Sequence, residues 1–143
     1  MQKGKILALD YGAKRVGVAS GDSEAGIAFP RCVISNNGIL RLVEDIVALC
    51  VELDVRTIVI GLPLNMTEDQ IENRIMPDVK KLADELGREL DKVDVMFYDE
   101  RLSSFEADEL MNEAEKSYGK KPLGRDAYAA QVILQRFFDN NLK

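Results

Sequence analysis

The order of short apolar runs and amphipathic runs predicts an α/β fold, with a mixed five-stranded sheet flanked by helices. Three short β-rich runs come first, at residues 6–10, 16–20 and 31–35, with turn-forming segments between them. Two further apolar runs, at residues 57–63 and 93–100, each follow a segment with helical periodicity. Short connections predict a three-strand antiparallel meander, and helical crossovers predict two parallel strands added to the same sheet.

The segments between the first three strands are rich in residues that favour turns. Between the first two strands the chain reads YGAKR, and Gly12 suits a tight turn there. The segment GDSEAGIAFP, residues 21–30, contains glycine and proline, so we expect a loop before the third strand. The sequence NNG at residues 36–38 then ends the meander.

Helical periodicity marks the segments that cover the sheet. Apolar residues recur every three or four positions at residues 39–53, which predicts the first helix. A second helical pattern covers residues 68–90, where Pro77 either kinks the helix or marks its true start. Ser103 is followed three positions later by Glu106, a capping-box pattern that predicts another helix start. A last helix is expected at residues 125–140.

Length and composition are those of one globular domain spanning residues 1–143. Apolar residues make up 46% of the chain and charged residues 31%, as in soluble proteins. No apolar run approaches the roughly 18 residues of a membrane span. The first ten residues, MQKGKILALD, lack the long apolar core of a signal peptide. We therefore expect a cytoplasmic protein.

The absence of histidine restricts the chemistry that the chain can perform. Histidine general bases, Ser-His-Asp triads and histidine metal ligands are all excluded. Cys32 and Cys50 stand 18 positions apart in apolar surroundings, and we interpret both as core residues. Hydrolysis by this chain would therefore depend on carboxylates, lysines, hydroxyls or metal ions held by oxygen ligands.

Acidic residues stand at the ends of predicted elements. Asp10 ends the first strand, Asp99 and Glu100 end the fifth, and Asp126 opens the last helix. In sheets with parallel strands, chemistry collects at the carboxyl ends of the strands, so these carboxylates could meet at one edge. Gathered carboxylates repel one another unless a divalent cation is bound. The arrangement favours metal-assisted hydrolysis of phosphodiester bonds.

Each acid also has a purely structural interpretation. Asp10 could be an ordinary turn residue. Asp99 and Glu100 could face solvent or pair with Arg101. Asp126 could stabilise the first turn of the last helix through its dipole.

Two groups of cations lie near these acids. Lys14 and Arg15 follow Asp10 and could bind a phosphate, or they could be exposed charges beside a hairpin. The net charge of −6 argues against general binding of nucleic acids. However, the segment KSYGKKPLGR, residues 116–125, carries four bases and no acid, so it could contact a nucleic-acid backbone or form a solvated loop. Its Tyr118 could stack on a base.

Four blocks of the sequence together resemble the YqgF family, also called RuvX, of Holliday-junction resolvases. The blocks are LALDYGAKRVGVA, GLPLNM, DERLSSFEA and GRDAYAAQVILQRFFD, and they occur in the order of the family over nearly the whole chain. The resemblance implies an RNase H-like fold and a nuclease that depends on Mg²⁺ or Mn²⁺. It also implies structured RNA or branched DNA as the partner, since the family is linked to maturation of the small-subunit ribosomal RNA precursor and to junction cleavage.

The resemblance assigns roles to particular residues. It implies that three acids are catalytic and bind the metal: Asp10, Glu100 and Asp126. Other motif positions would bind substrate or shape the site: Arg15, Asn65, Arg101 and Ser103. We add three cations of the basic segment as expected substrate-binding residues: Lys120, Lys121 and Arg125. A monomer and a homodimer are both consistent with the sequence, although symmetric cleavage of a junction would call for a two-fold dimer.

The sequence departs from the family pattern in one loop. After GLPLNM the chain reads TEDQIENRIMP, without the usual glycine and with Pro77 added. The shape of this rim therefore differs from the pattern, whereas the three acids are retained. Serines in LSSFEA replace the more usual threonines and keep both hydroxyls.

Two other functions remain open from the sequence. Actin-like ATPases and sugar kinases also begin with an apolar strand followed by DYG, but they need two such domains closing over a nucleotide. A non-catalytic RNA-binding or ribosome-assembly factor could keep the same fold. Retention of all three acids favours the nuclease over this factor.

Overall fold

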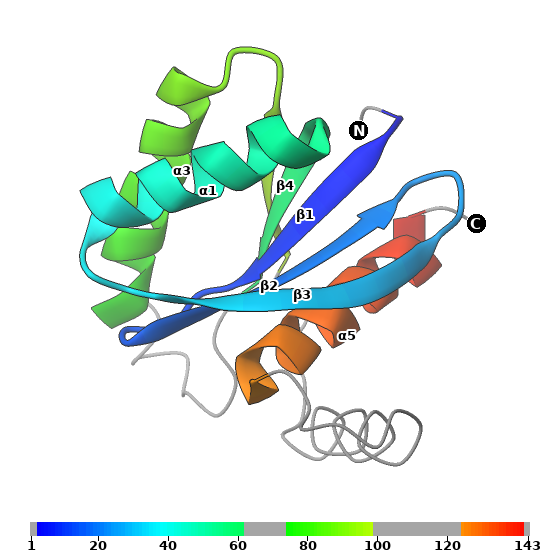
Figure 1. Ribbon diagram of the computed structural model, residues 1–143, viewed down its shortest axis with the longest axis horizontal. Helices are drawn as coiled ribbons and strands as arrows, with labels where there is room; N and C mark the ends of the chain where they lie inside the picture. The colour runs from blue at the N-terminus through cyan, green and yellow to red at the C-terminus, as the bar shows by residue number, and fades with distance from the viewer. Residues whose placement is uncertain (1–2, 62–73, 99–123, 142–143) are drawn as a thin grey trace.

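Five strands form one mixed sheet in the order β3-β2-β1-β4-β5 (Figure 1). The structure is a computed structural model that describes residues 3–61, 74–98 and 124–141. The strands are β1 Lys5–Asp10, β2 Arg15–Asp22, β3 Ile27–Ser35, β4 Val55–Gly61 and β5 Asp94–Tyr98. The first three are antiparallel neighbours, and β4 and β5 add parallel to β1. The predicted meander with two parallel additions is confirmed.

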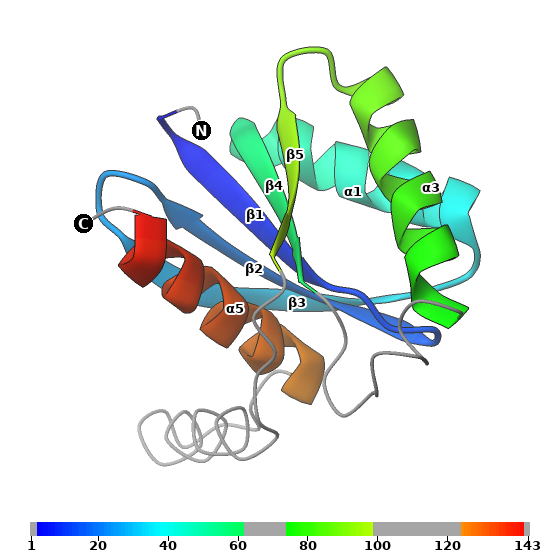
Figure 2. The same ribbon diagram turned by 180° about the vertical axis from the view of Figure 1, so that it is seen from behind.

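Helices cover both faces of the sheet. The helices α1 (Ile39–Leu53) and α3 (Met76–Glu89) lie on one face, and α5 (Arg125–Asn141) lies on the other (Figure 2). Because side chains alternate along a strand, β1 supplies both cores. Leu7 and Leu9 pack beneath α1 and α3, whereas Ile6 and Ala8 pack beneath α5. The central position of β1 therefore fixes its last residues between two packed layers.

The third strand begins earlier than the sequence predicts. We expected a loop over residues 21–30, but β2 continues to Asp22 and β3 already begins at Ile27. Only a short turn separates them, with Gly26 at φ 68°. Pro30 is tolerated because β3 is an edge strand, and the register shifts beside it, where Val18 pairs with Cys32 and Ala19 with Pro30.

The second predicted helix begins at its proline. Pro77 stands in the first turn of α3, where its missing N–H costs no helical hydrogen bond. In the described part of the chain this agrees with the interpretation that Pro77 marks a helix start. The capping-box pattern at Ser103 lies outside the described residues.

Both cysteines carry free thiols. Cys50 lies on the buried face of α1, where burial raises its thiol pKa to about 12, and Cys32 is half-buried. These positions agree with their interpretation as core residues. Within the described ranges, no helix is both long and apolar enough to cross a membrane.

Glutamines of α5 bind the backbone of the edge strand β3. The Gln135 side chain accepts a hydrogen bond from the Ala28 N–H at 3.0 Å and donates one to the Gly26 carbonyl at 2.9 Å. Gln131 donates to the Ala28 carbonyl at 3.2 Å. These bonds satisfy polar groups at the beginning of an edge strand, where they would otherwise be open to pairing with another chain.

Gln135→Ala is expected to lower the free energy of unfolding by roughly 1–3 kcal/mol, because two partly buried backbone groups lose their partners. Urea denaturation of this variant measures the loss. Gln131→Ala removes a single bond and should cost less. Equal urea midpoints for the wild type and Gln135→Ala would show that the two bonds add nothing to stability.

Candidate active site

Asp10 occupies the last position of β1, at the carboxyl edge of the sheet. It continues the alternation of Ile6 and Ala8, so it belongs to the face covered by α5. Its two neighbours in the sheet are glycines, Gly17 on β2 and Gly61 on β4. The residue is only 7% exposed, which is unusual for a carboxylate.

The flanking glycines let α5 approach the sheet beside Asp10. A Cβ atom on Gly17 would overlap the Asp126 carbonyl group, and one on Gly61 would meet the Ile133 side chain. The first turn of α5 therefore lies directly on β2. This contact brings the second predicted acid, Asp126, next to the first.

The carboxyl group of Asp10 is strongly perturbed. Burial raises its pKa most, the nearby Asp126 carboxylate raises it further, and the Arg125 guanidinium lowers it, with a resulting value of about 7. One of its oxygens, Oδ1, is buried and has no hydrogen-bond partner among the described residues. A buried carboxylate beside a second carboxylate, with an oxygen still free to accept, fits the ligands that hard divalent cations take.

Arg15 contacts Asp126 across the site. It begins β2, and its Nε donates to Asp126 Oδ2 at 3.1 Å. The two side chains are 62% and 34% exposed, so the ion pair contributes little to stability. The guanidinium thus partly neutralises, from the solvent side, the negative charge of Asp10 and Asp126, which we call the acid pair. The structural interpretation of Asp126 also holds, since it stands in the first turn of α5.

The described residues contain only part of the predicted site. Asp10, Arg15, Arg125 and Asp126 come together at the carboxyl edge. The strand β5 ends at Tyr98, two positions before Glu100. Six predicted site residues lie outside the described ranges: Asn65, Glu100, Arg101, Ser103, Lys120 and Lys121. Within those ranges, no group of three acidic or cysteine side chains is arranged to hold a metal ion.

Sequence reasoning missed two residues at this edge. The strand predicted at residues 16–20 contains Gly17, and a glycine inside a strand often marks the close approach of another backbone. Asn36 was interpreted as a chain break, yet its side chain binds the turn between β1 and β2. No local sequence signal identifies that second contact.

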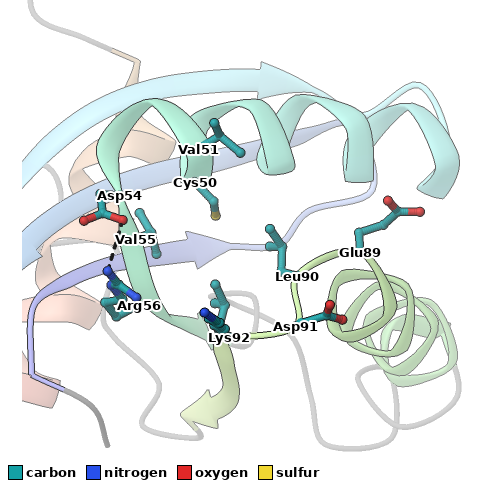
Figure 3. Close-up of a pocket in the computed structure, with 10 residues that line it drawn as sticks. Cys50, Val51, Asp54, Val55, Arg56, Glu89, Leu90, Asp91 and Lys92 are labelled. Atoms are coloured by element: carbon teal, nitrogen blue, oxygen red, sulfur yellow. Dashed lines mark ion pairs between the residues drawn. The ribbon is translucent and has the colours of Figure 1, made fainter.

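A pocket of about 420 Å³ lies away from these residues (Figure 3). The end of α1, the start of β4 and the segment after α3 line it, including Val51 and Lys92. Arg56 pairs there with Asp54 at 3.5 Å. The pocket contacts the first residues of β4, whereas Asp10 pairs with Gly61, the last residue of that strand. The pocket therefore lies toward the opposite edge of the sheet from Asp10. None of the four described site residues lines it.

Comparison with known proteins gives one consistent family. The RuvX family model, described as Holliday junction resolvase, matches residues 4–140. A Neisseria meningitidis protein named "Putative pre-16S rRNA nuclease" is 34% identical over 96% of this chain and 89% of its own length. Relatives of the same name from Chloroflexus aurantiacus and Syntrophomonas wolfei are 36% and 35% identical, each over 94% of this chain and over 86% and 94% of their own lengths.

Solved structures show the same fold. Thermus thermophilus RuvC in complex with a Holliday junction substrate has a TM-score of 0.60 at 11% identity, covering 97% of this chain and 96% of its own. A second T. thermophilus RuvC structure gives 0.57 at 12% identity and 96% coverage of both chains. The fold is therefore RNase H-like, as in RuvC-type resolvases. Together with the sequence matches, these findings show that the chain belongs to the RuvX family of nucleases.

Proposed function

We propose that this protein is a divalent-metal-dependent nuclease that cleaves phosphodiester bonds in the precursor of the small-subunit ribosomal RNA. The buried Asp10, placed beside Asp126 at the carboxyl edge of the sheet, carries the proposal. The names of relatives that are 34–36% identical over most of both chains support RNA as the substrate. Branched DNA is the second candidate, because the family description is Holliday junction resolvase.

Three acids would hold two Mg²⁺ or Mn²⁺ ions: Asp10 and Asp126, together with Glu100. Ions bound there supply activation of a water molecule and stabilisation of charge on the leaving oxygen. The chain itself contributes rigid placement, because Asp10 ends a strand packed on both faces and Asp126 rests on Gly17. Rigid placement matters because catalysis depends on ligands held to a fraction of an ångström.

Cations of the chain would bind the substrate backbone. Arg15 reaches Asp126 from the solvent side, and 62% of its side chain stays exposed, so it can also meet a phosphate next to the acids. Arg125 opens α5 close enough to lower the Asp10 pKa. Further contacts with substrate are proposed for residues outside the described ranges: Asn65, Arg101, Ser103, Lys120 and Lys121.

A cleavage assay on two substrates tests this function. A labelled fragment of the ribosomal RNA precursor and a labelled four-way DNA junction are each incubated with protein and Mg²⁺, Mn²⁺ or chelator. The proposal predicts metal-dependent cutting of the RNA fragment and slower or no cutting of the junction. The reverse preference would make branched DNA the substrate. Tight binding of RNA without any cutting would instead identify a ribosome-assembly factor on a nuclease fold.

A further inference from the structure

The turn between β1 and β2, residues 11–14, lies next to the acid pair. Asp10 precedes it directly, and Arg15 follows it directly. The turn has no helical or strand structure of its own. What holds these four residues in place therefore adds to the strand packing that positions Asp10 and Arg15.

Asn36, the residue after β3, forms three hydrogen bonds to this turn. Its Nδ2 donates to the Gly12 carbonyl at 2.9 Å and to the Tyr11 hydroxyl at 3.2 Å. Its backbone N–H donates to the Lys14 carbonyl at 2.8 Å. One residue, 22 to 25 positions away in sequence, thus binds the beginning, middle and end of the turn.

The opposite side of the Asn36 side chain is bound to the start of α1. Its Oδ1 accepts a hydrogen bond from the Gly38 N–H at 3.2 Å, immediately before the helix begins at Ile39. Tyr11 is 3% exposed and packs in the core beneath α1 and α3. The turn is therefore held by its aromatic ring in the core and by Asn36 at its polar groups.

We propose that Asn36 is the positioning residue of the catalytic edge, whose side-chain amide holds the β1–β2 turn and so sets where Asp10 and Arg15 lie relative to Asp126. The inference rests on the proposed nuclease function. Among the residues that the structure describes, Asn36 bonds to the turn and to Gly38, so we expect it to act through the turn. A displacement of about 1 Å at a catalytic group can cost roughly 100-fold in rate, and residues that orient metal ligands typically affect affinity or activity by about 10- to 100-fold.

Two substitutions of Asn36 separate this role from support of α1. Asn36→Ala removes every side-chain bond. Asn36→Asp keeps an oxygen that can accept from the Gly38 N–H but, when ionised, loses both donations to the turn. Its added negative charge would by itself attract a cation, so weaker metal binding by this variant cannot be an electrostatic effect. Tyr11→Phe removes only the hydroxyl acceptor.

Asn141→Ala is the matched control. The Asn141 amide also donates to a backbone carbonyl, that of Phe137 at 2.9 Å, but it lies in the last turn of α5, far along the helix from Asp126. All variants are compared with the wild type under conditions where urea denaturation shows each to be folded. The measurements are the Mn²⁺ dissociation constant by calorimetry and the single-turnover rate of RNA cleavage.

Asn36→Ala and Asn36→Asp should each weaken Mn²⁺ binding and slow cleavage by about 10- to 100-fold. Tyr11→Phe should have a smaller effect, and Asn141→Ala should match the wild type. Wild-type values for Asn36→Asp in both measurements would overturn the positioning role and leave the nuclease function standing. Wild-type protein that binds Mn²⁺ without cutting would overturn the function, and the Mn²⁺ affinities would still decide the role of Asn36.

Discussion

Asp10→Asn is expected to abolish cleavage while stabilising the protein at pH 8. The substitution removes the charge that would bind a metal ion and keeps the size of the side chain. Metal ions contribute several kcal/mol of transition-state stabilisation, and each 1.36 kcal/mol corresponds to a factor of ten, so we expect a loss of at least about 1,000-fold. Binding of RNA should persist, because the exposed Arg15 is untouched.

The stability gain follows from the raised pKa of Asp10. The carboxyl has a pKa of about 7 in the folded chain, against 3.8 for an unperturbed aspartate, mainly because it is buried. The folded state therefore favours the protonated form of Asp10. The stability that this protonated carboxyl contributes is fully present below pH 3.8 and is lost as the pH rises through about 7. Asparagine resembles the protonated carboxyl at every pH, so Asp10→Asn should keep this stability at pH 8.

Urea denaturation in the presence of chelator measures this difference. At pH 8 the variant should exceed the wild type by a few kcal/mol, on the order of 1.36 kcal/mol per unit of pKa difference. At pH 4 the two proteins should be close to equal. A wild type that is as stable as the variant at pH 8, without metal, would show that the ionised Asp10 is not destabilised by its surroundings.

Gly17→Ala is expected to disrupt the site and the fold together. The added Cβ would overlap the backbone carbonyl of Asp126, which cannot rotate away as a flexible side chain would. The first turn of α5 would have to move off β2, taking Asp126 away from Asp10. Overpacking of this kind costs roughly 1–3 kcal/mol or more, and the displaced carboxylate should lower the cleavage rate by about 100-fold.

Gly87→Ala provides the control for this substitution. Gly87 lies in the exposed last part of α3, where an added Cβ would meet no described atom within 4 Å apart from the backbone of its own helix. Alanine should therefore stabilise the helix by about 0.5–1 kcal/mol and leave cleavage unchanged. Urea midpoints and cleavage rates of the two variants are compared directly. A Gly17→Ala protein as stable and as active as the wild type would contradict the close packing of α5 on β2.

The sequence predicts the sheet well because its strands are coded locally. Short apolar runs bounded by turn residues mark β1, β2 and β4, and the helical crossovers determine which strands are parallel. The start of β3 was missed because glycine and proline there suggested a loop. Pro30 is compatible with a strand only because β3 lies at the edge of the sheet, and edge position is a property of the whole fold.

The candidate site was predictable only in part, because it too depends on contacts set by the whole fold. The position of Asp10 at the end of a buried strand follows from the sequence. Its pairing with Asp126 depends on a contact between Gly17 and a backbone more than 100 residues away. The role of Asn36 depends on three hydrogen bonds to a turn more than 20 residues earlier. A glycine inside a strand indicates only that some backbone approaches Gly17, not which one, and no local pattern marks the contact made by Asn36.

Titration of Mn²⁺ into the wild type, Asp10→Asn and Asp126→Asn at pH 6 and pH 8 tests the central claim most directly. The paired acids should bind Mn²⁺ in the wild type, and each substitution should weaken binding by more than tenfold. Because a proton competes for Asp10 below its pKa of about 7, wild-type affinity should also be higher at pH 8 than at pH 6, by up to about tenfold for one competing proton. Equal affinities in all three proteins at both pH values would show that Asp10 and Asp126 do not form the metal-binding centre.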